Sequence, residues 1–307
     1  MARHQIVVVT PAGRRAYLEI LQSHLLADAS IDAWHLWDNC RDPRDRAYVE
    51  GLAERHAKIR LVRAVDARGD NRSINQFYRL TRDPDTFYVK MDDDIVHLPT
   101  DFGARFYRAA AAEAGRFTWW SPLVINNALC SWLIKHHSRV RVEANLSAVA
   151  SSELGWRDPR FAEALHRRFL AALAEGTAED FAVPDFAVSL SRFSINCIGY
   201  FGADAAAWGD GFCPIGVDDE DWISAVLPSR TGRPGRIVGG LVVSHFAFFP
   251  QEADLLRTDL LARYAGLAGV APPPPPKPRR PTPVRDFGLR LWRRHLAPRP
   301  EWFPRDG

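Results

Sequence analysis

Three consecutive aspartates, Asp92, Asp93 and Asp94, follow an apolar run that begins at Phe87. Carboxylates this close together repel one another and resist burial unless a cation or hydrogen-bond donors neutralise them. Because alternate side chains of a strand point the same way, we expect Asp92 and Asp94 to face one crevice and Asp93 to turn aside. Oxygen ligands of this sort suit Mg²⁺ or Mn²⁺, which keep positions open for water and phosphate. A solvated turn, or acids that cap a helix, is the competing interpretation.

The strands that would carry these carboxylates alternate with helices along the first hundred residues. Apolar and β-branched runs predict strands over residues 6–10, 33–37 and 59–65, and a fourth that begins at residue 87 and ends in the three aspartates. Apolar residues at helical spacing predict helices over residues 14–26, 45–57 and 73–80. This alternation is typical of βαβ units, so we predict an α/β fold with a mainly parallel central sheet flanked by helices.

Ligands of such sheets bind in the crevice outside the carboxyl ends of the strands. Thr10, Asp38 and Asp66 each fall at the carboxyl end of a predicted strand, as the three aspartates do. We therefore expect all of these side chains to line one crevice, which strengthens the metal-binding interpretation.

The rest of the chain is less regular. Further strands are predicted over residues 117–127, 193–201 and 237–243, and further helices over 159–175, 203–208 and 252–265. Two polar or irregular connections, residues 140–155 and 177–185, are interpreted as part of a helical insertion over the crevice. We predict a catalytic domain over residues 1–270, a proline-rich linker over 271–283 and a basic tail over 284–307.

Composition narrows the class of protein. The net charge of +3 is concentrated in residues 277–307, which hold nine basic residues against three acids; the rest of the chain is therefore acidic, and no nucleic-acid-binding surface is expected there. The four cysteines lie far apart without metal-ligand spacing, as is common in a reducing compartment. No apolar stretch approaches the roughly 18 residues that span a bilayer, and no signal-peptide pattern is present, so we expect a cytoplasmic protein.

The tail can be drawn as an amphipathic helix over residues 284–297, with bulky apolar side chains on one half and arginines on the other. Such a helix can lie on an anionic membrane, here the inner face of the plasma membrane. Docking on its own domain, or disorder, is the alternative.

Two acidic motifs, in this order, resemble those of GT-A-fold glycosyltransferases. The first, Tyr88-Val89-Lys90-Met91-Asp92-Asp93-Asp94, preceded by Asp38-Asn39, Asn71 and Asn75, is similar to the nucleotide-sugar half of family 2-like enzymes; its Lys-x-Asp-Asp-Asp form also resembles galactosyltransferase and fringe-type enzymes. The second runs from Ser194 to Phe201, through Gly211-Phe212 to Gly216-Val217-Asp218-Asp219-Glu220-Asp221-Trp222, and resembles the acceptor half.

The resemblance covers about residues 5–250 and implies a GT-A-type, Rossmann-like sheet. It assigns the nucleotide-sugar half to about residues 5–100, an insertion or acceptor region to 101–190, and the acceptor half with the acidic motif to 191–250. The resemblance implies that Asp92 lies near the sugar or ribose of the donor, that Asp94 binds Mn²⁺ or Mg²⁺, and that Asp38 contacts the nucleobase. The residues expected to bind the donor are Thr10, Asp38, Asp66, Asn75, Lys90, Asp92 and Asp93.

His245, after the last predicted strand, resembles the third metal contact of the family. A buried histidine that only supports the site is the alternative, since imidazole is an uncommon partner for Mg²⁺ although acceptable to Mn²⁺. An inverting enzyme also needs a base, and the family pattern implies Asp219. The register is uncertain by one residue, so Asp218, Glu220 and Asp221 stay candidates, and these acids also fit the first turn of a helix.

The leading prediction is a metal-dependent, inverting glycosyltransferase that moves a sugar from a nucleotide donor, in the first instance UDP-linked, to a glycan or lipid-linked acceptor, as in polysaccharide biosynthesis. A sugar nucleotidyltransferase is the second candidate, although the chain lacks the Gly-rich basic loop after the first strand that such enzymes carry. The third is a catalytically silent protein that binds a glycan or a membrane.

Overall fold

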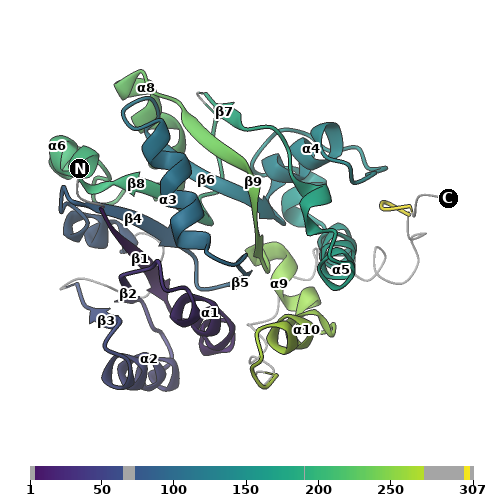
Figure 1. Ribbon diagram of the computed structural model, residues 1–307, viewed down its shortest axis with the longest axis horizontal. Helices are drawn as coiled ribbons and strands as arrows, with labels where there is room; N and C mark the ends of the chain where they lie inside the picture. The colour runs from purple at the N-terminus through teal and green to yellow at the C-terminus, as the bar shows by residue number, and fades with distance from the viewer. Residues whose placement is uncertain (1–3, 65–72, 190, 273–300, 305–307) are drawn as a thin grey trace.

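The computed structural model describes residues 4–64, 73–189, 191–272 and 301–304 (Figure 1). The predicted contacts of Asp66 and Asn71, most of the proline-rich linker and the predicted tail helix lie outside these residues.

The first half of the sheet is parallel. β1 (Gln5–Ala12) pairs with β2 (Ala33–Asp38) on one side and with β4 (Thr86–Met91) on the other, and β3 (Ile59–Val62) extends the sheet beyond β2. The connections are α1 (Arg15–Ala27), α2 (Pro43–Arg55) and a 3₁₀ helix over Ile74–Leu80. Asp42 caps α2 by accepting from the Arg44 N–H, and Pro43 suits the first helical position because it has no N–H to satisfy.

The second half of the sheet is mixed. β8 (Cys197–Phe201) lies between β4 and β6 (Trp119–Ile125) and is antiparallel to both, whereas β9 (Gly235–His245) runs parallel to β6. Two short strands, β5 (Ile95–His97) and β7 (Phe186–Val188), pair antiparallel with β9. Six strands thus run in one direction, namely β3, β2, β1, β4, β6 and β9, which confirms the predicted α/β class with a mainly parallel sheet.

Helices cover both faces of this sheet (Figure 1). The longer ones after β4 are α3 (Phe102–Ala112), α4 (Ala128–His137), α5 (Pro159–Glu175), α6 (Gly202–Trp208), α9 (Phe249–Leu255) and α10 (Leu260–Leu267). Short turns of helix occupy Glu153–Arg157, Ala178–Phe181, Gly209–Gly211, Asp219–Asp221 (α7), Trp222–Val226 and Leu227–Thr231 (α8). The tryptophans Trp34, Trp37, Trp119 and Trp120 are buried in the core between the layers.

Two expectations from the sequence need correction. The three aspartates lie in the turn between β4 and β5 and not on a strand, so the predicted strand ends before them, at Met91. The helix expected over 252–265 is two helices, α9 and α10, because the chain turns between them and Thr258 Oγ1 bonds the Leu255 carbonyl. The strand predicted over residues 117–127 is present as β6.

The last described residues return to the body of the protein. Trp302 is buried, and its ring lies 5.6 Å from the ring of Phe161 on α5. The Trp302 carbonyl accepts a hydrogen bond from the Glu143 N–H at 2.8 Å. Within the described residues, no helix combines the length and the apolar character that crossing a bilayer requires.

Candidate functional site

The carboxyl ends of the parallel strands meet at one edge of the sheet. Because β8 runs the other way, its amino end reaches the same edge. The polar residues placed there are Gly13 and Arg14 after β1, Asp92, Asp93 and Asp94 after β4, Asn126 and Asn127 after β6, Asn196 before β8, and His245 at the end of β9. This is the edge at which open α/β sheets bind their ligands.

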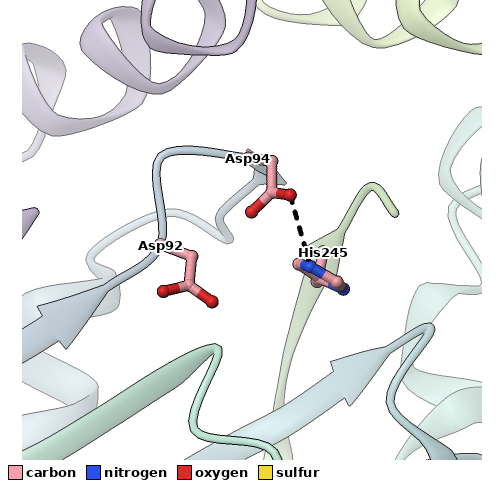
Figure 2. A group of neighbouring side chains, drawn as sticks. All are labelled: Asp92, Asp94 and His245. Atoms are coloured by element: carbon pink, nitrogen blue, oxygen red, sulfur yellow. Dashed lines mark ion pairs between the residues drawn. The ribbon is translucent and has the colours of Figure 1, made fainter. Parts of the chain in front are cut away.

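Asp92, Asp94 and His245 form a group, called here the metal group, in which one ligand atom from each residue lies within 4.8 Å of the others (Figure 2). Asp94 Oδ2 is 3.4 Å from His245 Nε2. Asp94 Oδ1 is buried and, within the described part of the chain, has no hydrogen-bond partner. A buried carboxylate oxygen without a donor is costly, and a bound cation removes that cost. Two carboxylates and an imidazole therefore fit a divalent metal, and Mn²⁺ suits the mixed donor set better than Mg²⁺.

Asp93 turns away from the metal group. It accepts from Arg14 Nε at 2.9 Å and from the Gly13 N–H at 3.0 Å. Arg14 also lies 2.9 Å from Asp94 Oδ2 and 3.0 Å from Glu252 Oε1. Burial raises the pKa of Asp93, whereas Arg14 and His245 outweigh burial at Asp94 and hold the pKa of that carboxyl well below its usual range. Asp94 therefore stays ionised and available as a ligand.

Lys90 fixes Asp92 from the other side. Its ammonium group donates to Asp92 Oδ1 at 2.5 Å and to the Ile195 carbonyl at 2.9 Å. Burial acts to lower the pKa of Lys90, but the adjacent Asp92 raises it above its usual value, so the lysine is charged. Lys90 thereby orients one metal-group carboxylate.

The charges around the metal group do not balance within the protein. Among the described residues, five carboxylates face two cationic side chains, namely Asp92, Asp93, Asp94, Asp219 and Glu252 against Arg14 and Lys90. Negative charge is therefore in excess around the metal group. Burial acts to lower the pKa of His245, but Asp94 raises it above its usual value, and a bound divalent cation would lower the excess further.

Asp218 and Glu220 of the acidic turn at α7 share one partner, whereas Asp219 has another. Asp218 caps the turn by accepting from the Asp221 N–H at 3.0 Å, and Arg192 donates to Asp218 at 3.0 Å and to Glu220 at 2.7 Å. Asp219 instead accepts from the Tyr78 hydroxyl at 3.3 Å and interacts electrostatically with Lys90 and Asp92. Burial raises the pKa of Asp219, which makes its carboxylate a better proton acceptor. Asp219 is therefore the acid of this turn that interacts with Asp92 of the metal group, whereas Asp218 and Glu220 pair with Arg192.

The other predicted donor contacts have partners within the protein. Asp38 lies 3.3 Å from Arg46 and 3.4 Å from Arg63. Thr10 is fully buried and accepts from Trp34 Nε1 at 3.0 Å.

Asn75 holds the loop that leads to the acidic turn. Its amide donates to the Pro214 carbonyl at 2.7 Å and to the Val217 carbonyl at 3.0 Å. Asn75, which belongs to the 3₁₀ helix before β4, thus joins that helix to the loop that ends at Val217, directly before Asp218.

Five residues at this edge were not among the sequence-based candidates. They are Arg14, Asn126, Asn127, Asn196 and Glu252. Asn126 and Asn127 carry the same signal as the aspartates, because they directly follow an apolar strand. Glu252 lies on a helix after the last strand, and no local pattern connects it to Arg14.

No model of a known protein family matches this sequence, and no characterised protein sequence matches it. Among solved structures, the chain resembles a mannosyltransferase from Pyrobaculum calidifontis, PcManGT, in complex with GDP-Man and Mn²⁺, with a TM-score of 0.46, 15% identity, and coverage of 97% of this chain and 71% of that one. It also resembles residues 1–349 of TarS from S. aureus, with a TM-score of 0.42, 13% identity, and coverage of 87% and 67%.

A third similar structure is 4-diphosphocytidyl-2C-methyl-D-erythritol synthase from Anaerococcus prevotii DSM 20548, with a TM-score of 0.44, 11% identity, and coverage of 86% of this chain and 96% of that one. At these scores the similarity concerns general architecture and does not extend to the reaction.

Proposed function

We propose that this protein is a metal-dependent glycosyltransferase, which moves a sugar from a nucleotide-sugar donor to a glycan or lipid-linked acceptor. One observation carries the proposal: Asp92, Asp94 and His245 converge at the carboxyl edge of the sheet, and Asp219 interacts electrostatically with Asp92. A glycosyl transfer needs both a cation near the leaving diphosphate and a proton acceptor near the attacking hydroxyl.

Asp92, Asp94 and His245 would hold the cation. A divalent ion there would neutralise the charge that develops on the nucleoside diphosphate as it leaves. Asp92 is half-buried, whereas Asp94 and His245 are buried, so Asp92 is the most solvent-exposed member of the metal group. Lys90 holds Asp92 in place and Arg14 holds the turn through Asp93, which fixes the ligands before the donor arrives.

Asp219 would act as the base. The acceptor hydroxyl oxygen forms a bond to the anomeric carbon, the bond from that carbon to the diphosphate oxygen breaks with its electron pair, and the hydroxyl proton passes to Asp219. Attack from the face opposite the leaving group inverts the anomeric configuration. The raised pKa of Asp219 supports this role, because a carboxylate with the usual pKa is a weaker proton acceptor.

The donor would extend from the metal group toward the carboxyl ends of β1 and β2, where Asp38 would meet the nucleobase. A UDP-linked donor is the first choice for the screen below. Thr10 and Asn75 are fully buried and would support the donor site from behind. Contact of Asp66 with the donor, and contact of residues 284–297 with a membrane, complete the proposal.

A thermal-shift screen of nucleotide sugars, with and without Mn²⁺, tests the donor and the metal together. We expect one nucleotide sugar to raise the melting temperature only when Mn²⁺ is present, since a ligand that binds the folded state stabilises it. Slow release of sugar from that donor in the absence of acceptor would support transfer chemistry. Release of pyrophosphate from a nucleoside triphosphate would favour the nucleotidyltransferase, and no response to any nucleotide sugar would overturn the proposal.

A further inference from the structure

The metal group draws its ligands from strands that are not neighbours in the sheet. Asp92 follows β4 and His245 ends β9, and in the sheet order β8 and β6 stand between them. Asn126 and Asn127, at the end of β6, contact residues on both sides of this gap. We infer that Asn126 and Asn127 are positioning residues: Asn126 orients His245, and Asn127 orients Asp92 through Asn196. This inference rests on the proposed metal site.

Asn126 sets the protonation pattern of His245. Its carbonyl oxygen lies 3.3 Å from His245 Nδ1, and since a carbonyl only accepts, this contact requires the proton to be on Nδ1. Nε2, which faces Asp94, is then the nitrogen left free to bind a metal when His245 is neutral. The Asn126 carbonyl therefore favours the single tautomer of His245 in which Nε2 can bind a metal.

The backbone of Asn126 has an unusual conformation that its own side chain supports. Its φ is +62°, in the left-handed region that Asn tolerates better than other residues with a Cβ. The buried amide donates to the Phe246 carbonyl at 2.9 Å and to Gln251 Oε1 at 3.0 Å. A strained backbone conformation persists only where neighbouring groups hold it. Here the Phe246 carbonyl and Gln251 hold the Asn126 amide, and the Asn126 carbonyl lies next to the His245 imidazole.

Asn127 uses its side chain for two tasks. Its Oδ1 caps α4 by accepting from the Cys130 N–H at 3.2 Å. Its Nδ2 donates to the Ser194 carbonyl at 3.0 Å and to Asn196 Oδ1 at 3.1 Å. The cap is a contact within α4, whereas the hydrogen bond to Asn196 connects Asn127 to the start of β8, the strand that pairs with β4.

Asn196 completes the connection to the metal group. Its amide lies 3.4 Å from Asp92 Oδ2, and its carbonyl accepts from the Asp92 N–H at 2.8 Å. The other oxygen of Asp92 is held by Lys90. Both carboxylate oxygens are therefore oriented, one by Lys90 and one through the chain of amides that begins at Asn127.

The substitution Asn127→Ser separates the two tasks of Asn127, because Ser caps a helix about as well as Asn but cannot donate to Asn196. We expect Asn127→Ser to keep the cap, to lose less stability than Asn127→Ala, and to bind Mn²⁺ about 10- to 100-fold more weakly, measured from the free Mn²⁺ signal in electron paramagnetic resonance. Asn127→Ala loses the cap as well, and we expect it to lose both stability and affinity. Recovery of Mn²⁺ affinity by Ser would assign Asn127 to capping alone and overturn the inference.

Asn126→Gly and Asn126→Ala give a second measurement that does not depend on α4. Glycine adopts the left-handed backbone without strain and alanine does not. We expect Mn²⁺ affinity to fall in both variants, and further in Asn126→Ala. Equal affinity in the wild type and Asn126→Ala would contradict the inference even if Asn127→Ser failed to fold.

The same titration separates this inference from the proposed function. If the wild type does not bind Mn²⁺, the metal site and the inference both fall. If the wild type binds Mn²⁺ and Asp94→Asn does not, while Asn127→Ser and Asn126→Ala bind as the wild type does, the metal site stands and only the positioning role is lost.

Discussion

Arg14 Nη2 lies 2.9 Å from Asp94 Oδ2, the same carboxylate oxygen that faces His245 Nε2 at 3.4 Å. Asp94 Oδ2 thus lies close both to the permanently charged Arg14 and to His245 of the metal group. The arginine neutralises a buried carboxylate when no other cation is near, and it also weakens the attraction that this oxygen exerts on a divalent ion.

Replacing Arg14 by Gln should lower the free energy of unfolding, by an amount that depends on pH. Breaking a buried ion pair leaves an uncompensated charge, and because the Arg14 side chain is 31% exposed we expect a loss of about 2 kcal/mol in the free energy of unfolding at pH 7. Burial already raises the pKa of Asp93, and loss of the arginine raises it further. The variant therefore takes up a proton at Asp93 as the pH falls, and the deficit should shrink between pH 7 and pH 5.

Urea denaturation at both pH values measures this deficit. Arg44→Gln is the control, since the Arg44–Asp42 pair is exposed and such pairs contribute little. A deficit for Arg14→Gln that grows toward acid pH would contradict the assigned pairing.

Asp94→Asn should abolish Mn²⁺-dependent binding of the donor and leave the fold intact. The charge that the metal needs is removed, while the shape of the side chain is kept. We expect the Mn²⁺-dependent thermal shift to disappear, as EDTA should make it disappear in the wild type. Asp85→Asn is a matched control, because Asp85 is exposed at the amino end of β4, opposite the metal group. Unchanged donor affinity and metal dependence in Asp94→Asn would exclude Asp94 as the ligand.

Asp219→Asn should allow donor binding and block transfer. General base catalysis contributes typically 10²- to 10⁴-fold, so we expect kcat to fall by about 10³ with little change in the thermal shift caused by the donor. Asp218→Asn and Glu220→Gln should affect transfer far less, because Arg192 pairs with both of those carboxylates. Transfer by Asp219→Asn at the wild-type rate would exclude Asp219 as the base.

Tyr78→Phe should move the acid limb of the pH–rate profile to higher pH. Burial raises the pKa of Asp219, and the hydrogen bond from the Tyr78 hydroxyl opposes that rise. Asp219 accepts a proton only when ionised, so activity falls as the pH drops through its pKa. Without the hydroxyl the pKa is higher and the fall begins earlier. Tyr48→Phe, which removes a hydroxyl bonded to Gln22, should leave the profile unchanged.

Trp302→Ala should destabilise the protein by about 2–3 kcal/mol in chemical denaturation, less than a fully central tryptophan, because Trp302 packs at the margin of the core. Removal of residues 273–307 should have a similar effect by exposing Phe161. A truncated protein with wild-type stability would show that this contact adds nothing.

The strand ends were predictable from the sequence because hydrophobic periodicity is a local property. The runs before Asp38 and Asp92 became β2 and β4. The strand predicted to end at Thr10 is β1, which continues to Ala12, so Thr10 is buried within the strand and not at its carboxyl end.

Pairings between distant residues were not predictable in this way. Arg192 pairs with Asp218 and Glu220, whereas Asp219 accepts from the Tyr78 hydroxyl, although these acids are adjacent in the sequence. The contact between Asn127 and Asn196 spans 69 residues and depends on the insertion of β8 between β4 and β6. Composition and local spacing do not predict these contacts, because the contacts depend on how the strands and helices pack.

The contacts of Trp302 join sequence positions that lie far apart. Its ring packs on Phe161 of α5, and its carbonyl accepts from the Glu143 N–H. Residues 301–304 therefore belong to the same packed body as α5, and a substitution at Trp302 is felt at a helix more than a hundred residues earlier in the sequence.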